Sequence, residues 1–307
     1  MTEAEEAAAH WGGEALVPLR DRENTVVAMR LPGGRAVLRL HRRGYQEEGA
    51  IRSELWWQAA LAEAGLPVPR PVPSLAGSPL VHLSTGRVAT ALSWLPGEPL
   101  GLAGRPLSGT PEAQVRRHHA LGRLIARVHD ATDALALPDW FERPRWDLAG
   151  LVGEAPRWGR FWAHPALAPA EAARLREVRA ALRRAIGDHA GAGDLGLIHA
   201  DVLRENVLVD DRGLSLIDFD DSGFGFRAYD LGTVLSQDQR QPNRDDLRAA
   251  LIEGYRSLRP VDAAMVDAFT LMRCCASVGW AMTRLPAGDP VHRSHIDRAL
   301  MLADRIL

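Results

Sequence analysis

The sequence predicts an α+β protein with two lobes, a smaller one built on antiparallel strands and a larger one that is mainly helical. Short apolar stretches separated by tight turns occupy the N-terminal part, which is typical of a β-meander. The run Leu95-Pro96-Gly97-Glu98-Pro99 then interrupts all regular patterns, and beyond it apolar residues recur at helical spacing. We therefore expect a β-rich lobe over residues 1–95 and a mainly helical lobe over residues 96–307.

The first lobe is predicted to contain five strands and one helix. The strands are expected at residues 15–20, 26–31, 35–41, 80–84 and 87–94. The helix is expected at residues 47–64, where Ile51 and Leu55 begin an apolar face at helical spacing. Gly65 is placed to end this helix, and the prolines that follow prevent its continuation.

Long amphipathic patterns predict the helices of the second lobe. They cover residues 112–131 and 169–188, with an irregular aromatic stretch at residues 138–162 between them. From Tyr229 onward the pattern indicates several more helices, with breaks near Pro242, Pro260 and Pro286. A cleft is expected at the hinge between two such lobes, where ligand sites are common.

The composition excludes several classes of protein. The formal net charge of the 307 residues is −2, and the chain lacks the basic bias that predicts nucleic-acid binding. Every basic residue is arginine, so any role that an enzyme of this type gives to lysine must fall to arginine or be absent. No apolar run approaches the roughly 18 residues of a membrane span, and the acidic start is unlike a signal peptide, so we expect a cytoplasmic protein.

One segment carries most of the predicted chemistry. It reads His199-Ala200-Asp201, then Asn206 five residues after the aspartate, then Asp218 twelve residues later. Between Asn206 and Asp218, two short apolar strands flank the turn Asp210-Asp211-Arg212-Gly213. A histidine, an aspartate and an asparagine at this spacing, followed by a second aspartate, match the catalytic loop of kinases.

The residue types fit phosphoryl transfer. Asp201 is the candidate catalytic residue, because a carboxylate can orient the hydroxyl group that receives the phosphate. Asn206 and Asp218 offer the oxygen ligands that Mg²⁺ prefers, and Asp220 is a possible further ligand. His199 is expected to support the loop rather than to take part in the chemistry.

On these residues the chain resembles the family of aminoglycoside phosphotransferases and choline kinase-like enzymes, which are distant relatives of protein kinases. The motif is met by His199, Asp201, Asn206 and the run Ile217-Asp218-Phe219. The resemblance implies a protein-kinase-like fold, with ATP and Mg²⁺ as cofactors. It also implies that Asp230, in Tyr229-Asp230-Leu231, braces the catalytic loop through backbone hydrogen bonds.

The resemblance extends to the first lobe. Arg39 stands where the family usually carries a lysine to the ATP phosphates, and Glu54 matches the carboxylate that pairs with it; the alternative is an ordinary surface ion pair. Ser93 and Leu95 match the hinge segment that meets adenine through its backbone. The chain lacks the glycine-rich phosphate loop, and Glu23-Asn24-Thr25 is a weak candidate to cover the phosphates.

Within the family, the chain looks most like the branch of type II homoserine kinases and the bacterial stress-response Ser/Thr kinase. We expect transfer of the γ-phosphate to a hydroxyl group of a small metabolite, with an amino-acid-like compound as a candidate. The alternatives are a Ser/Thr kinase of a protein or peptide, an antibiotic phosphotransferase and a nucleotide-binding pseudokinase. Arg143, Arg145 and Arg160 are candidates to clamp a carboxylate. The sequence identifies neither the acceptor nor the oligomeric state.

Overall fold

The computed structural model describes residues 2–21, 24–190 and 194–306. The chain forms two compact units that do not follow the sequence in a single cut. The first unit comprises Met1–Glu98, Ala134–Arg143 and Leu208–Asp220. The second comprises Pro99–Asp133, Pro144–Val207 and Asp221–Leu307. Among the described helices, none is long and apolar enough to cross a membrane.

A five-stranded antiparallel sheet forms the base of the first unit. Its strand order is β1-β2-β3-β5-β4. The strands are β1 (Glu14–Asp21), β2 (Thr25–Leu31), β3 (Gly34–Leu40), β4 (Leu80–His82) and β5 (Val88–Ser93). Each lies where the sequence predicted a strand. The register between β1 and β2 shifts on both sides of Pro18, because proline has no N–H group to donate to the neighbouring strand.

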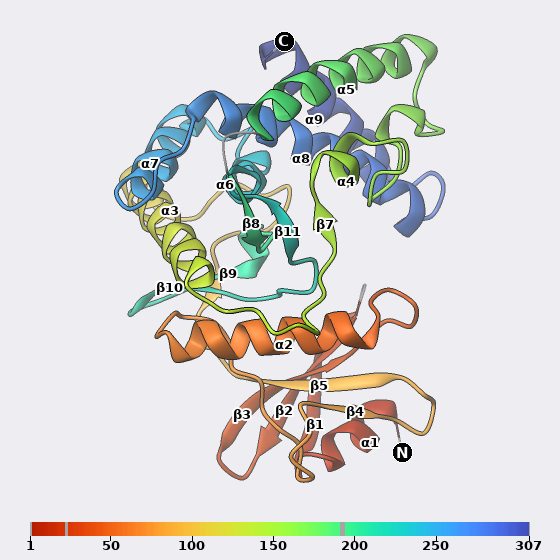
Figure 1. Ribbon diagram of the computed structural model, residues 1–307, viewed down its shortest axis with the longest axis vertical. Helices are drawn as coiled ribbons and strands as arrows, with labels where there is room; N and C mark the ends of the chain where they lie inside the picture. Colours follow the sequence, from red (N-terminus) through yellow and green to blue (C-terminus); the bar gives the residue numbers. More distant parts are fainter. Residues whose placement is uncertain (1, 22–23, 191–193, 307) are drawn as a thin grey trace. The chain divides into compact units, whose positions relative to one another are not determined.

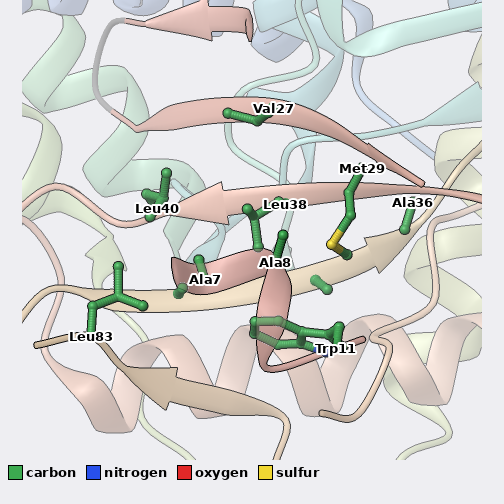
Figure 2. Packing of buried hydrophobic residues seen from close by; sticks show 11 residues of the cluster. Ala7, Ala8, Trp11, Val27, Met29, Ala36, Leu38, Leu40 and Leu83 are labelled. Carbon is green, nitrogen blue, oxygen red and sulfur yellow. The ribbon is translucent and has the colours of Figure 1, made fainter. Parts of the chain in front are cut away.

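One face of this sheet packs against the N-terminal segment. Side chains alternate along β3, so Ala36, Leu38 and Leu40 point to the same side and meet Trp11 and helix α1 (Glu3–Ala9) in one buried cluster, as Figure 2 shows. Helix α1 was not predicted from the sequence. A signal for it exists, because Thr2 and Glu5 have the spacing of a capping box and make both of its hydrogen bonds.

Helix α2 (Glu48–Glu63) covers the other face of the sheet. Ile51 and Leu55 pack there against Leu80 and Leu92, and Val37 of β3 joins them from the sheet. The alternation that turns Val37 toward α2 also turns Arg39 toward it. A polar side chain of β3 is thereby brought into a largely apolar layer.

The predicted hairpin after the motif is present. It consists of β9 (Val207–Asp210) and β10 (Gly213–Leu216), in a three-stranded sheet of order β10-β9-β6 with β6 at Glu98–Pro99. The Asp210 carboxylate accepts hydrogen bonds from the backbone N–H groups of Arg212 and Gly213 and so closes the turn. The backbone of Leu216 donates to the carbonyl of Pro67, which ties the end of the hairpin to the first unit.

Helices dominate the second unit. They are α3 (Pro111–Asp133), α4 (Leu148–Val152), α5 (Pro169–His189), α6 (Arg227–Ser236), α7 (Arg244–Arg256), α8 (Ala263–Arg284) and α9 (Pro290–Ile306). Helices α3 and α7 lie side by side (Figure 1). Glycines permit this close approach, since a Cβ atom on Gly122 would lie 2.1 Å from the carbonyl oxygen of Leu251, and one on Gly254 would lie 2.0 Å from that of His119.

A small sheet in the second unit was not predicted. It has the order β7-β11-β8, with β7 (Arg145–Trp146), β8 (Leu195–Ile198) and β11 (Gly223–Phe226). Strands of two to four residues are too short to show a sequence period. Trp146 of β7 is buried, packs edge-on against Trp158 and stacks on Tyr229, so most of the aromatic stretch belongs to the core. Trp140, 54% exposed, is the exception.

Candidate active site

The predicted catalytic loop follows β8 and begins with a strained residue. Ala200 has a φ of 65°, in the left-handed region that non-glycine residues seldom adopt. Its N–H group donates to Asp230 Oδ1 at 2.7 Å, and the N–H of His199 donates to Asp230 Oδ2 at 3.0 Å. These two bonds hold the turn in its unusual conformation, and such strain is concentrated at functional sites. They are the backbone contacts that the resemblance implied for Asp230.

Asp230 is itself held by a buried chain of hydrogen bonds. His129 Nε2 lies 3.1 Å from Asp230 Oδ2, and His129 Nδ1 lies 3.0 Å from the hydroxyl group of Tyr255. An ionised carboxylate can only accept, so Nε2 donates to Asp230, and in the neutral imidazole Nδ1 then accepts from the tyrosine. Burial raises the pKa of Tyr255, which keeps its hydroxyl proton in place as the donor. Helix α3 thus supports the catalytic loop through α6.

Both carboxylate oxygens of Asp201 accept hydrogen bonds from other side chains. Asn206 Nδ2 donates to Oδ2 at 2.9 Å and also to the backbone carbonyl of Asp201 at 2.9 Å. Arg273 of α8 donates to Oδ1 at 2.6 Å. His199 is fully buried and accepts from the N–H of Asp201 at 3.3 Å, a supporting contact of the kind predicted for it. Sequence reasoning missed Arg273, since 72 residues separate it from Asp201 and no motif includes it.

Asn206 has the features of a metal ligand. Both contacts of its amide nitrogen are made to Asp201, and its Oδ1 is buried with no hydrogen-bond partner among the described residues. A buried carbonyl oxygen without a partner is costly unless a ligand meets it. Within the described ranges, no three His, Cys, Asp or Glu side chains cluster as a metal site.

A second buried network fixes the turn that carries Asn206, the 3₁₀ helix η3 (Arg204–Asn206). Arg204 binds Asp238 through Nε at 3.1 Å and through one terminal nitrogen, and both side chains are at most 2% exposed. His118 Nε2 lies 3.0 Å from the other oxygen of Asp238. Charged groups this deep are stable only when fully paired, so the network specifies one position for the loop. The sequence motif includes Arg204 but not its partners.

The remaining predicted site residues lie in the first unit. Asp218 has a φ of 66°. Among the described residues, Asp218 and Ala200 are the two non-glycine residues with a φ in the left-handed region. Arg39 Nη1 binds Glu54 at 2.7 Å, and its Nη2 lies 3.3 Å from Asp218 Oδ1. The pairing of Arg39 with Glu54 is therefore present. The alternative of a surface ion pair is wrong, because the two side chains are 6% and 1% exposed.

Asp220 is buried beside Asp218 and is fixed by its neighbours. Asn24 Nδ2 donates to Asp220 Oδ2 at 3.1 Å, and Gln46 Nε2 donates to the backbone carbonyl of Asp220 at 2.9 Å. Arg143 donates to the same carbonyl at 2.6 Å and to that of Ala50. Of the segment predicted to cover the phosphates, Glu23 lies outside the described residues, while Asn24 is occupied with Asp220.

The arginines considered as carboxylate clamps have other partners. Arg143 is buried among backbone carbonyls and supports the segment around Asp220. The guanidinium of Arg145 lies 5.7 Å from the ring centre of Phe224, and Arg160 donates to the carbonyl of Glu154. Their positions in the structure do not indicate a clamp.

In the predicted hinge segment, two polar groups of Ser93 already form hydrogen bonds with Arg70. The N–H of Ser93 donates to the carbonyl of Arg70 at 2.7 Å, and its Oγ accepts from the N–H of Arg70 at 2.8 Å. The N–H group and the hydroxyl oxygen of Ser93 are therefore both engaged by Arg70. The guanidinium of Arg35 lies over the ring of Trp94, 3.7 Å from the ring centre. Leu95, the other residue predicted to contact adenine, is half-buried.

Comparison with known proteins identifies the family. The description "Phosphotransferase enzyme family" (APH) applies to residues 15–265, most of the chain. The chain belongs to the phosphotransferase enzyme family. A homoserine kinase of Acidiphilium cryptum (strain JF-5) is 29% identical over 289 residues, covering 86% of this chain and 77% of the relative. A homoserine kinase of Sinorhizobium fredii is 33% identical, and the alignment spans 64% of its length.

Solved structures agree with this membership. A microcompartment-associated aminopropanol kinase has a TM-score of 0.86 at 27% identity, covering 98% of this phosphotransferase and 96% of the other chain. Amicoumacin kinase, with AMP-PNP and Ca²⁺ bound, has a TM-score of 0.77 at 18% identity, covering 96% and 90% of the two chains, and supports the fold alone. The predicted α+β, protein-kinase-like fold and family are confirmed.

The enzyme class follows from the family. Kinases of this kind transfer phosphate from ATP to a hydroxyl group with the help of a divalent metal, so the predicted phosphotransferase activity and its cofactors are confirmed at that level.

Proposed function

We propose that this phosphotransferase transfers the γ-phosphate of ATP to the hydroxyl group of a small amino-acid-like metabolite, in the cytoplasm. The observation that carries the proposal is the arrangement at Asp201. Its carboxylate is held at both oxygens, and the amide that holds one of them presents a buried oxygen of its own. A fixed carboxylate next to an unsatisfied carbonyl oxygen suits a hydroxyl acceptor and a magnesium ion.

Asp201 acts in this proposal as the group that orients the acceptor. Phosphoryl transfer is catalysed mostly by positioning and charge stabilisation, so the aspartate need only accept a hydrogen bond from the attacking hydroxyl and take its proton late. The side chain is 17% exposed, which leaves it reachable. A carboxylate offers roughly four acceptor sites, so its bonds to Asn206 and Arg273 are compatible with a further bond from the acceptor hydroxyl.

The remaining roles follow the motif. Magnesium, when bound, neutralises charge on the phosphates of ATP. The proposed ligands of magnesium are Asn206, Asp218 and Asp220. The proposed contacts to ATP are Arg39, which is paired with Glu54, and the hinge residues Ser93 and Leu95. His199 and Asp230 are proposed to support the catalytic loop. The guanidinium of Arg39 offers a planar fork of donors that suits phosphate, although its geometry differs from that of the usual lysine.

The relatives support a small acceptor. Homoserine and aminopropanol, the compounds in their names, share a short carbon chain with a hydroxyl and an amino group. Homoserine also carries a carboxylate. The ratio of kcat/KM for the two compounds therefore measures whether this enzyme recognises the carboxylate, which a site built to bind it would favour by about 10²-fold or more.

A phosphate-transfer assay tests the proposal. The purified chain is offered Mg-ATP with homoserine, an aminopropanol, choline, an aminoglycoside and a Ser/Thr peptide, and ADP release is measured. We expect turnover with a small amino alcohol or hydroxy amino acid. Turnover with the peptide or the aminoglycoside alone would replace the proposed acceptor class, and nucleotide binding without turnover on any acceptor would favour a pseudokinase.

The variant Asp201→Asn tests the role of the aspartate. It keeps the size of the side chain and removes the charge, so kcat should fall by about 10²–10⁴-fold while the affinity for ATP stays within about threefold. Asp211→Asn, an identical change in the exposed turn between β9 and β10, is the control and should leave kcat unchanged. Equal activity of Asp201→Asn and wild type would rule out the proposed role.

A further inference from the structure

Arg273 is a buried arginine of α8 that the family motif does not contain. It is 5% exposed, and its guanidinium reaches the catalytic loop with Nη2 2.6 Å from Asp201 Oδ1. A nitrogen–oxygen separation this short is typical of a charge-assisted hydrogen bond. The contact is made to the residue proposed to orient the acceptor, so the placement of Arg273 bears directly on the chemistry.

The surroundings of Arg273 leave it little freedom. Its Nη1 lies 3.3 Å from Ser277 Oγ one turn along α8, and Ser277 Oγ in turn donates to the backbone carbonyl of Arg273 at 3.0 Å. The guanidinium lies over the ring of Trp158, 4.5 Å from its centre. A planar cation held by an aromatic face and a neighbouring hydroxyl keeps one orientation.

We propose that Arg273 is a positioning residue for phosphoryl transfer, which fixes the carboxylate of Asp201 in the orientation that receives the acceptor hydroxyl. The inference rests on the proposed function and extends it. Asn206 binds one carboxylate oxygen and Arg273 binds the other, so loss of the Arg273 contact weakens the control of the carboxylate's orientation. The asparagine belongs to the motif, whereas the arginine comes from a helix 72 residues away.

A purely structural role for Arg273 makes a different prediction. An arginine that only compensates a buried charge affects the fraction of folded enzyme, and the folded molecules keep their kcat. A positioning arginine affects the turnover of folded enzyme, and it does so only as long as Asp201 has a carboxylate to position. The two roles are separated by a double-mutant cycle.

The cycle uses Arg273→Lys and Asp201→Asn, singly and together, in the full-length chain. Lysine keeps the positive charge but has neither the planar fork nor the same reach, so folding should survive. We expect kcat to fall about 10- to 100-fold in Arg273→Lys, because small displacements of a catalytic group have effects of this size, with KM for ATP within about threefold. In the Asp201→Asn background, the same change should alter kcat by less than about threefold.

Arg248→Lys is the matched control. Arg248 of α7 forms a two-point ion pair with Asp267 of α8, at 2.6 and 2.7 Å, away from the catalytic motif. Its replacement should leave kcat unchanged. Equal kcat in Arg273→Lys and wild type, or an equal fall in both backgrounds, would overturn the proposal.

The melting temperatures of the same four proteins provide a readout that does not depend on turnover. Coupled groups have non-additive effects on Tm, so the double variant should lose less than the two single variants together. Additive losses would overturn the contact itself. If the wild-type enzyme turns over no acceptor in the panel, the proposed function fails, and the Tm cycle still decides whether Arg273 holds Asp201.

Discussion

Arg39 allows the energetics of the first unit to be tested directly. The change Arg39→Met removes the cation from a buried pair in which Glu54 is 1% exposed. The Glu54 carboxylate then lies in an apolar layer with no counter-charge, and breaking a buried pair in this way costs about 3–5 kcal/mol. The second contact of Arg39, to Asp218 at 3.3 Å, adds little, because that carboxylate is 32% exposed and such pairs contribute up to about 1 kcal/mol.

The expected loss in the free energy of unfolding is large enough to detect by thermal unfolding. A loss of 1 kcal/mol lowers Tm by about 2–4 °C in a domain of about 150–250 residues and by more in a smaller one, so Arg39→Met should lower Tm by at least about 6 °C. The double variant Arg39→Met/Glu54→Leu removes both charges and fills the space with apolar groups. It should recover most of the loss, since replacing a whole buried pair is often neutral.

Differential scanning calorimetry of wild type, single variant and double variant provides the comparison, with a fluorescent ATP analogue to follow nucleotide binding. Arg35→Met is the control, because Arg35 lies exposed on the same strand and should cost less than about 1 kcal/mol. A double variant as unstable as the single one would refute the reasoning that the uncompensated Glu54 charge causes the loss. Both Arg39 variants should bind ATP more weakly, because Arg39 is proposed to contact the phosphates.

Two further predictions concern the second unit. His295 is partly buried and donates to the carbonyl of Ser277. Desolvation, aided by Arg298, lowers its pKa to about 4. The unfolded chain therefore binds the proton more readily, and stability is lost as pH falls below about 6.5. Between pH 7 and pH 5, protonation of His295 should lower the free energy of unfolding, measured with urea, by about 2 kcal/mol. The variant His295→Gln should lose that part of the pH dependence. An unchanged pH dependence in the variant would contradict the assignment to His295. Gly122→Ala should destabilise by about 1–3 kcal/mol, since the new methyl group meets backbone of α7. Gly187→Ala on α5, where the nearest atom lies 3.8 Å away, should be neutral or stabilising, and equal effects would contradict the close-approach argument.

Local sequence was sufficient for the regular elements. The strands of the first sheet, helix α2 and the hairpin β9–β10 lie where alternation, helical spacing and turn residues predicted them. These signals depend on neighbours two to four residues apart, which the sequence displays directly. The short strands β7, β8 and β11 were not predicted, because they form only through pairing between segments that are distant in the sequence.

The candidate site divides in the same way. Asp201, Asn206 and Asp218 could be named from their spacing alone, since kinase chemistry requires those groups close together along one loop and hairpin. The groups that hold them could not be named so. Arg143 meets the backbone of Asp220 from 77 residues away, and it had been considered for a substrate instead.

The sequence by itself thus determined the fold class, the family resemblance and the phosphoryl-transfer chemistry, because each rests on short-range patterns. Only the tertiary structure decided which side chains bind the Asp201 carboxylate, that Arg39 and Glu54 form a buried pair, and that helices α3 and α7 meet at glycines. The physical reason is that a hydrogen bond or a close helix contact selects its partner by position in space. For Asp201 that partner is Arg273, on a helix that nothing in the motif connects to it.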